Sequence, residues 1–435
     1  MSEWISTELG TICDEYGGVI QTGPFGSQLH QHDYVAEGTP VIMPKDIKGG
    51  KIELAEIARI DDINVKRLSK HKVQVGDIVI PRRGEISKCT LITEEQTGFI
   101  CGTGCLKITP PKKVLDPTYF RYYLSRSDTI EWLINNAVGA TMLNLSGGIL
   151  KRLPVVVPPL KEQKVLAAIL SSYDDLIENN LKRIKLLEEM AQITFEEWFI
   201  RMKFPGHETA VFDKETGLPE GWVKRPISDF CEKITDGTHD SPKQVEQGVP
   251  LITGKHIENG FINFESAYLI SYEDHEQIKK RSGLSEWDIL FSNIGTLGNT
   301  GVVTEDFEYS CKNVVIFKRK HGFEYFLYSY LSNEHTVNKL DSMSSGVAQK
   351  FYSLKFIRAL EETLPSDDLI KEFNTLAEPI YAAKFKLNNQ IKLLKEARDI
   401  LLPRLLTGMI DIEQVELPEA MLNRLEEQED KIATA

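Results

Sequence analysis

Two long stretches of the chain place apolar residues in steps of three and four, the spacing of one face of an α-helix. The first stretch begins after Pro158 and Pro159 and continues to Trp198. It predicts a helix of roughly 40 residues, which at about 1.5 Å per residue is roughly 60 Å long. The apolar positions that define this face are Leu166, Leu170, Tyr173, Ile177, Leu181, Ile184, Leu187, Ala191, Phe195 and Trp198.

The second stretch begins after Pro365 and repeats the same spacing. Ser366 stands where an N-cap is expected, and Asp367 and Asp368 fall in the first turn, where acidic side chains interact favourably with the helix dipole. Pro403 is expected to kink or end this helix. The apolar positions of this second face are Leu369, Phe373, Leu376, Ile380, Ala383, Leu387, Ile391, Leu394, Ala397, Leu401 and Leu405.

One apolar face of this length cannot stay exposed to water. The simplest arrangement therefore packs the two helices against each other as an antiparallel coiled coil, whose length would fix the distance between the segments at its ends. The core of the pair is predicted to bury Leu170, Ile177, Ile184 and Leu187 against Ile380, Leu387, Ile391 and Leu394.

The segments before the two helices follow a different pattern. Short apolar runs, such as VGDIVIP and CLKITP in the first segment and VPLITG and NVVIFK in the second, are separated by turn residues. This pattern predicts short strands joined by turns, with a helix or two such as the stretch over residues 117–136. Each segment is expected to form a compact α+β domain.

The two halves of the chain are copies of one unit. GTPVIMPKDIKGGKI at residues 38–52 aligns without a gap with GVPLITGKHIENGFI at residues 248–262, and seven of the fifteen positions are identical. Ordered matches at a nearly constant separation indicate an internal duplication. The further matches pair residues 76–88 with 287–299, residues 139–153 with 346–360, and the Ile-Lys-Leu-Leu motif at 184–187 with the same motif at 391–394.

The predicted architecture is therefore α+β with a pseudo-two-fold internal repeat, in which two long helices separate two similar globular domains. The expected boundaries are residues 1–155 for the first domain, 156–202 for the first long helix, 203–362 for the second domain, 363–412 for the second long helix, and 413–435 for an acidic tail.

Composition is ordinary for a globular protein, with 41% hydrophobic and 26% charged residues. The chain has no run of about 18 apolar residues, and its start, MSEWISTELG, lacks the basic end and the apolar core of a signal peptide. Six scattered cysteines include no C-x-x-C pair, and no histidine pair completes a metal set. We therefore expect a cytoplasmic protein with reduced thiols, no membrane contact and no bound metal.

The formal net charge of −13 argues at first against binding to nucleic acid. The charge is unevenly distributed, however. Residues 1–155 contain 18 acidic and 18 basic residues, whereas residues 413–435 contain seven acidic and only two basic ones. A DNA-binding face is thus compatible with the charge distribution, although no general basic bias points to one.

Several short motifs stand out along the chain. They are GPFGSQL near the start, GDIVIPRRG and DILFSNIG in the two copies, LPVVVPPLKEQKVLAAIL leading into the first long helix, LPEGW at the opening of the second half, and LLPRLLTGMID at the end of the second long helix. Together with the order of the domains, these motifs resemble those of one protein family, the specificity subunit of a type I restriction–modification enzyme. The resemblance covers nearly the whole chain.

The resemblance implies that the globular domains are target recognition domains, each of which reads one half of a split, asymmetric site in double-stranded DNA. It also implies that the long helices dock two modification (methyltransferase) subunits, in which S-adenosylmethionine is expected. Restriction subunits, with ATP and magnesium, are expected to join further out. No catalytic residue and no cofactor is expected in this chain itself.

Loops at equivalent places in the two copies carry different polar side chains, as two readers of different bases would require. Arginine favours bidentate contact with guanine, and asparagine favours adenine. The candidates for base contacts are Arg82, Arg83 and Lys88 in the first copy, and Asn293 and Asn299 at aligned positions in the second. The alternative, that these are ordinary solvated turn residues, stays open.

Other loop residues are further candidates for DNA contacts. Lys45 and Lys255 occupy the same place in the two copies, just after a strand, which suits contact with phosphates that carry no sequence information. The remaining candidates lie in polar, glycine-containing loops and in the segments before the long helices: Gln21, Thr141 and Asn144 in the first copy, and Thr238, Gln349 and Lys350 in the second.

Two other functions stay open from the residues alone. A DNA methyltransferase acting alone is disfavoured, because the chain has no NPPY-type or DPPF-type motif and no strand-to-helix G-x-G-x-x-G loop. GVPLITGKH is similar to a phosphate-binding loop but departs from the motif, and it is more simply explained as a strand and turn of the repeated fold. A coiled-coil adaptor without a DNA role is disfavoured, because a pure spacer gains nothing from two diverged domains.

Overall fold

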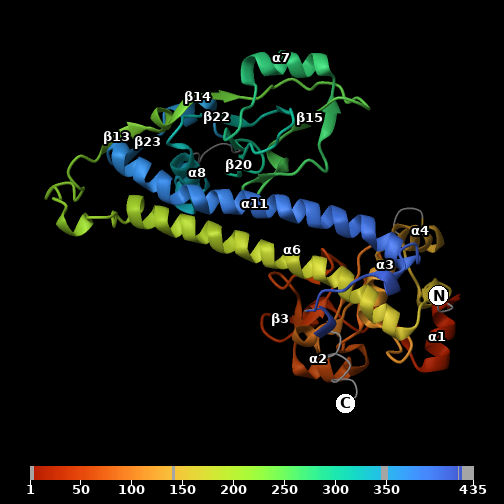
Figure 1. Ribbon diagram of the computed structural model, residues 1–435. Helices are drawn as coiled ribbons and strands as arrows, with labels where there is room; N and C mark the ends of the chain where they lie inside the picture. Colours follow the sequence, from red (N-terminus) through yellow and green to blue (C-terminus); the bar gives the residue numbers. More distant parts are fainter. Residues whose placement is uncertain (1–3, 140–142, 344–350, 420, 424–435) are drawn as a thin grey trace. The chain divides into compact units, whose positions relative to one another are not determined.

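The computed structural model describes residues 4–139, 143–343, 351–419 and 421–423. The chain divides into two compact units, which we call unit 1 and unit 2 (Figure 1). Unit 1 consists of residues 1–177 and 392–435, and unit 2 consists of residues 178–391. Unit 1 contains the globular domain of the first sequence copy and unit 2 that of the second, whereas each long helix is divided between the two units.

Unit 1 contains two four-stranded sheets. The first has the strand order β2-β11-β8-β9 and is antiparallel throughout, and the second has the order β10-β4-β7-β3, with β10 parallel to β4. The strands are β1 (Ile5–Glu8), β2 (Val19–Thr22), β3 (Tyr34–Val35), β4 (Thr39–Ile42), β5 (Ile47–Lys48), β6 (Lys51–Ile52), β7 (Arg59–Ile60), β8 (Ile78–Pro81), β9 (Thr90–Leu91), β10 (Ile100–Cys101), β11 (Cys105–Thr109) and β12 (Pro154–Val157). The short helices are α1 (Leu9–Tyr16), α2 (Asp62–Arg67), α3 (Pro117–Leu124), α4 (Ser127–Asn136) and α5 (Gly147–Lys151).

Unit 2 repeats this plan. Its antiparallel sheet has the order β14-β22-β19-β20, and its second sheet has the order β18-β15-β21, with β21 parallel to β15. The strands are β13 (Val223–Pro226), β14 (Cys231–Asp236), β15 (Val249–Ile252), β16 (Ile257–Glu258), β17 (Phe261–Ile262), β18 (Tyr268–Ile270), β19 (Ile289–Phe291), β20 (Thr300–Val302), β21 (Ser310–Cys311), β22 (Val315–Arg319) and β23 (Glu361–Leu364). The short helices are α7 (Tyr272–Ser282), α8 (Glu324–Ser332), α9 (Glu334–Met343) and α10 (Leu354–Arg358).

The matching topologies confirm the internal duplication. Each unit also has a two-stranded antiparallel sheet that joins its first strand to its last, β1 with β12 and β13 with β23. An ion pair with a buried aspartate recurs at the same place: the Lys107 ammonium lies 3.6 Å from the Asp77 carboxylate in unit 1, and Lys318 pairs with Asp288 in unit 2. The two copies thus share the order of their corresponding strands and a buried aspartate, although the second sheet has four strands in unit 1 and three in unit 2. The fold is a mixture of helices and sheets, as predicted.

Each unit has its own apolar core. In unit 1 the sheet residues Ile78, Ile80 and Leu106 pack with the aromatic side chains of α3. In unit 2 an aromatic cluster joins the long helices to the domain, with the Phe199 ring 5.0 Å from that of Phe326 and 5.2 Å from that of Phe373. The long helices therefore pack against the globular parts and are not free stalks. The six cysteines are buried as free thiols.

The two long helices are α6 (Leu160–Phe195), which continues as a π-helical turn over Glu196–Ile200, and α11 (Asp367–Leu406). Within unit 1 the Arg398 guanidinium lies 2.6 Å from the Asp174 carboxylate. Within unit 2, α6 and α11 lie side by side (Figure 1), and Asn180 bonds Gln390 at 3.4 Å while Lys384 bonds Glu188 at 2.9 Å. In unit 2 the later residue of α6 meets the earlier residue of α11, so the helices run antiparallel there.

The eight residues predicted for the core of the helix pair differ in burial. Leu187 and Leu394 are only half-buried, and Leu187 packs against the aromatic core of unit 2. Pro403 does not end α11, which continues to Leu406, because Leu405 and Leu406 are buried in the core of unit 1 and hold the last turn in place. The residues that are fully buried are Leu170 and Ile177 in unit 1, and Ile184, Ile380, Leu387 and Ile391 in unit 2.

None of the helices in the described part of the chain is both long enough and apolar enough to cross a membrane.

Candidate nucleic-acid interface

Three loops of unit 1 meet where strand β8 ends. The backbone N–H of Arg82 donates to the carbonyl of Gly104 at 2.7 Å, and the N–H of Leu145 donates to the carbonyl of Arg82 at 2.8 Å. An isolated β-bridge joins Arg83 to Asn144. The structure thus brings together two of the loops in which the sequence predicted DNA contacts, and we call the group Phe25, Arg82, Arg83 and Asn144 the unit 1 tip.

The side chain of Arg82 is held in place without a counter-charge. Its Nε donates to Asn144 Oδ1 at 3.3 Å, and its guanidinium carbon lies 5.9 Å from the centre of the Phe25 ring, which is itself 57% exposed. The other guanidinium N–H groups have no partner among the described residues. A guanidinium fixed at one edge and open at the other suits bidentate contact with the acceptors of a guanine.

The other two cationic candidates of this loop differ from Arg82. Arg83 is exposed, and no ion pair or hydrogen bond engages its side chain within the described part of the chain. Lys88 is half-buried and forms an ion pair with Glu85, so part of its charge is already compensated. Gly84 lies between them with a φ of 76°, and this left-handed conformation lets the chain turn at the tip.

The equivalent place in unit 2 has a different surface. The side chain of Asn293 is buried, and its Nδ2 donates to the carbonyl of Tyr352 at 2.9 Å. Asn299 is half-buried and donates to the carbonyl of Ile257 at 2.7 Å. These two predicted base readers therefore have internal backbone partners. The apolar side chains exposed here are those of Ile294 and Phe351, which form an isolated β-bridge of their own and which we call the unit 2 tip.

Lys45 and Lys255 are both exposed, and each lies beside a tip. Lys45 follows Pro44, whose ring packs against Gly104 of the loop that accepts from Arg82. Lys255 follows Gly254, which lies close to Ser292, two residues before Ile294 of the unit 2 tip. An added Cβ at Gly254 would lie only 2.1 Å from the hydroxyl of Ser292. An exposed ammonium at the same place in both units suits a phosphate contact, which needs charge and no base specificity.

The remaining candidates are placed less favourably or lie outside the described residues. Gln21 lies in β2, and its amide contacts the ring of His71 at 3.4 Å. Thr238 is buried, and its hydroxyl accepts from the backbone N–H of Asp240 at 3.1 Å. The candidates Thr141, Gln349 and Lys350 lie outside the described residues.

A charged cluster fixes the loop that follows β14 in unit 2. The ring of His239 bonds Asn313 Oδ1 at 2.8 Å and Asp236 Oδ2 at 2.7 Å, and Arg281 of α7 also pairs with Asp236. These hydrogen bonds, first that to Asn313 and then that to Asp236, raise the pKa of His239 above its usual value. The pKa of Asp236 is lowered, because its hydrogen bonds to His239 and Arg281 outweigh the effect of burial.

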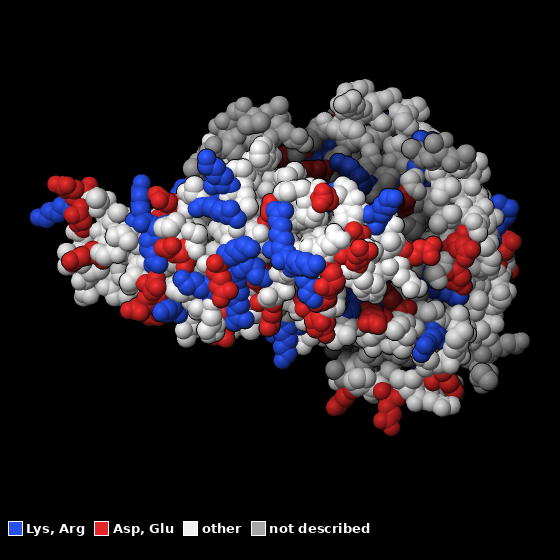
Figure 2. Space-filling model, turned by 90° about the horizontal axis from the view of Figure 1, so that it is seen from above, with Lys and Arg blue, Asp and Glu red and all other residues white. Residues whose placement is uncertain are grey.

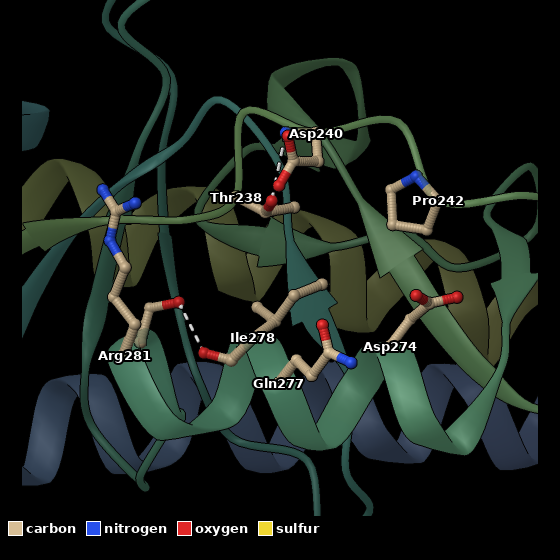
Figure 3. A pocket seen from close by; sticks show the side chains of 8 residues that line it. Thr238, Asp240, Pro242, Asp274, Gln277, Ile278 and Arg281 are labelled. Carbon is tan, nitrogen blue, oxygen red and sulfur yellow. Dashed lines mark hydrogen bonds between the residues drawn. The ribbon is translucent and has the colours of Figure 1, made fainter.

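Beside this cluster lies a small open pocket of about 220 Å³ between the loop and α7 (Figure 3). Asp240, Asp274 and Arg281 all line it. Asp274 is already engaged, because its carboxylate accepts from Ser271 at the start of α7 at 2.7 Å. With two carboxylates against one guanidinium, the pocket does not favour an anionic ligand such as phosphate.

On the face shown in Figure 2, Lys and Arg side chains alternate with Asp and Glu side chains and do not gather into one basic patch. DNA contacts on a face of this kind would depend on a few placed groups rather than on general positive charge. The sequence had not singled out Phe25 or Phe351; only their alignment with polar loops of the other copy could have drawn attention to them.

Comparison with known proteins places this arrangement in a family. The sequence pattern described as "Type I restriction modification DNA specificity domain" matches twice, over residues 20–189 and 219–393. These two matches cover most of the chain and coincide with its two copies. The chain therefore belongs to this family, as the motifs had indicated.

Individual relatives match over most of their own length. The specificity subunit of the type I restriction enzyme MjaIX from Methanocaldococcus jannaschii is 26% identical over 400 residues, which are 88% of this chain and 89% of the relative. The HindI specificity subunit from Haemophilus influenzae is 20% identical, with 84% and 93% covered. A crystal structure of the S subunit of a type I restriction–modification system from M. genitalium has the same fold, with a TM-score of 0.54 at 16% identity and with 93% and 96% covered.

Family membership decides between the functions that the residues left open. The chain is a DNA-recognition subunit of the type I restriction–modification class and not an enzyme in its own right. Neither a methyltransferase acting alone nor an adaptor without a DNA role is supported by the relatives, which are specificity subunits.

Proposed function

We propose that each unit of this chain reads one half of a split, asymmetric site in double-stranded DNA. The observation that carries the proposal is the contrast between the two tips. The same β-bridge, at the end of the same strand, carries Arg83 and Asn144 in unit 1 but Ile294 and Phe351 in unit 2. Side chains of different chemistry on one frame read different bases, so the two half-sites differ in sequence.

The exposed lysines and the net charge of the chain affect DNA binding in different ways in this proposal. Lys45 and Lys255 contact phosphates and set the position of each tip along the groove. The net charge of −13 limits what this chain contributes to general affinity for DNA. Partner subunits therefore supply further phosphate contacts in the assembled complex.

The long helices have two roles in the proposed function. As an antiparallel coiled coil between the recognition domains, residues 1–155 and 203–362, they set the distance between the half-sites. They also dock two modification subunits. An apolar stripe on α6 supports this second role, because Leu186, Met190 and Ile193 lie three and four residues apart and are all exposed.

We extend the proposal to the rest of the assembly. Restriction subunits join the complex further out and bring ATP and magnesium, while S-adenosylmethionine is bound by the modification subunits. In this proposal the chain itself holds no cofactor, works in the cytoplasm where the DNA is, and ends in an acidic segment at residues 413–435 without an assigned role.

The proposal is tested by exchanging one recognition domain in the complete complex. Residues 1–155 are replaced by the same region of a relative with a different target, and the methylated sites of a genome that carries the system are mapped. One half-site should change while the other stays. The reciprocal exchange of residues 203–362 is the matched control and should change only the other half-site. A change in both half-sites from either exchange would contradict separate reading by the two domains.

A further inference from the structure

The two bridged residue pairs at the tips, one in each unit, are equivalent. Arg83 and Asn144 are joined by an antiparallel β-bridge, and so are Ile294 and Phe351. The alignment of the duplicated copies pairs Arg83 with Ile294, at a separation of 211 residues, and Asn144 with Phe351, at a separation of 207. Whatever the tip of unit 1 faces in the bound complex, the tip of unit 2 faces the corresponding part of its own half-site.

The chemistry at this bridge is opposite in the two units. The guanidinium of Arg83 and the amide of Asn144 can form hydrogen bonds with base edges, whereas the side chains of Ile294 and Phe351 cannot. Both apolar side chains are nevertheless exposed, Ile294 by 37% and Phe351 by 50%. The amide that precedes Ile294 is no substitute, because Asn293 is buried and bonded to the carbonyl of Tyr352.

The surroundings of the pair favour a small apolar target over a protein surface. The neighbouring residues Thr296 and Lys255 are polar and exposed, and the Gly295 between Ile294 and Thr296 has open space around it. Two side chains are far less than the roughly 800 Å² that each partner buries in a standard protein interface. In the major groove, the apolar group that distinguishes one base from the others is the 5-methyl group of thymine.

We infer that Ile294 and Phe351 read thymine in the half-site of unit 2 by packing against its 5-methyl group. The inference rests on the proposed function and adds to it the kind of base that this tip selects. Unit 1 would select with hydrogen bonds at the equivalent place, and unit 2 would select with an apolar contact.

The test replaces thymine by deoxyuridine, which pairs with adenine in the same way but lacks the methyl group. The complex of the full chain with its modification subunits is titrated with duplexes that carry the mapped site. In separate duplexes, the thymines of one half-site or of the other are replaced. Replacement in the half-site of unit 2, identified by the domain exchange, should raise Kd about fourfold for each methyl group that is contacted.

Two variants assign the effect to the tip. In the double variant Ile294→Ala/Phe351→Ala, duplexes with thymine and with deoxyuridine should bind equally well, because the contact with the methyl group is gone. Val223→Ala is the matched control: it also truncates an exposed apolar side chain of unit 2, on strand β13, and should keep the full response to deoxyuridine. Phe351→Asn, which introduces the residue of unit 1, should shift the preference at that position toward adenine.

The possible failures are distinguishable. The inference is overturned if the half-site of unit 2 contains no thymine, or if the unmodified complex does not discriminate between thymine and deoxyuridine there. It is also overturned if the double variant loses modification subunits while the response to deoxyuridine remains, since the pair would then be a protein contact. A complex that binds no DNA at all would refute the proposed function as well.

Discussion

The buried ion pair between the two long helices in unit 2 gives the sharpest prediction of stability. The Lys384 side chain is fully buried, with 0% exposure, and its ammonium lies 2.9 Å from Glu188 Oε1 and 2.9 Å from the hydroxyl of Tyr328. It also lies 5.0 Å from the centre of the Phe261 ring. The lack of a side chain at Gly260 makes room for the Lys384 ammonium, because an added Cβ at this glycine would lie 2.5 Å from the ammonium nitrogen.

The change Glu188→Ala removes the counter-charge and leaves the cation buried. Breaking a buried pair in this way costs about 3–5 kcal/mol. The lower end applies here, because the Glu188 side chain is 31% exposed, which weakens the original attraction, and because Tyr328 and the Phe261 ring remain. A loss of about 3 kcal/mol lowers the melting temperature of a unit of this size by about 6–12 °C.

The opposite truncation should be milder. Lys384→Met removes the buried charge together with the cost of burying it, and Glu188 can turn its carboxylate to water. We expect a loss of about 1–2 kcal/mol, because the buried hydroxyl of Tyr328 loses its hydrogen bond to the ammonium while no buried charge is left uncompensated. The difference between the two variants follows from the unequal burial of the two partners.

The measurement is urea unfolding followed by circular dichroism, with thermal melts in parallel. The control is Glu189→Ala, the same change at the next position of α6, where the carboxylate is 51% exposed and its partner Lys185 is 79% exposed. It should change stability by less than about 0.5 kcal/mol. The reasoning fails if Glu188→Ala costs no more than this control, or if Lys384→Met costs as much as Glu188→Ala.

Three further predictions concern DNA contacts, pH and spacing. Arg82→Ala should relax specificity at one position by about 1–3 kcal/mol, whereas Lys45→Ala should weaken binding to all sequences and lower the salt slope by about 1; filter binding over a salt series separates the two. The raised pKa of His239 means that its contribution to stability is complete below its unfolded value of about 6.5 and is lost as the pH rises through the folded value. The difference in unfolding midpoint between the wild type and His239→Gln should therefore shrink from pH 5.5 to pH 8.5, and a constant difference would count against that linkage. Four residues inserted after Ile177 and four after Leu394 add about one turn, roughly 6 Å, to each helix, so the preferred spacer in methylation mapping should lengthen by about one or two base pairs; an unchanged spacer would show that the helices do not set it.

Periodicity made the long helices and the duplication predictable from the sequence. The apolar stripe from Leu166 to Trp198 lies in α6 and its π-helical turn, because a repeat of three and four residues over many turns has no other regular explanation. The fate of Pro403 was not predictable in this way. Helix propensity predicts that the helix ends at Pro403, but the burial of Leu405 and Leu406 in unit 1 outweighs that preference. Tertiary packing of this kind cannot be predicted from the local sequence pattern.

The sequence also could not predict which loop side chains face solvent and which are buried. Arg82 and Asn293 align in the duplication, yet Arg82 keeps most of its donors open while Asn293 is buried. The difference arises because a segment 59 residues later presents the carbonyl of Tyr352 to the Asn293 amide. Alignment shows which positions are equivalent, but only the packed structure shows which of them face solvent.

The arrangement of buried and exposed groups along one strand explains how two readers can diverge on one fold. Just before β8, Asp77 is buried, accepts a hydrogen bond from the N–H of Gln74 at 2.8 Å and pairs with Lys107. Just before β19 in unit 2, the buried Asp288 likewise accepts from a backbone N–H and pairs with a lysine, so both copies keep this carboxylate. Losing Asp77 would leave the buried Lys107 ammonium without its counter-charge, at a cost of several kcal/mol. Losing Asp288 would leave the half-buried Lys318 without its counter-charge. At the far end of the same strands the exposed tips touch no core, and surface changes there usually cost less than about 0.5 kcal/mol. One end of the strand is therefore constrained by folding, and the other end is free to take up whatever side chain a new half-site requires.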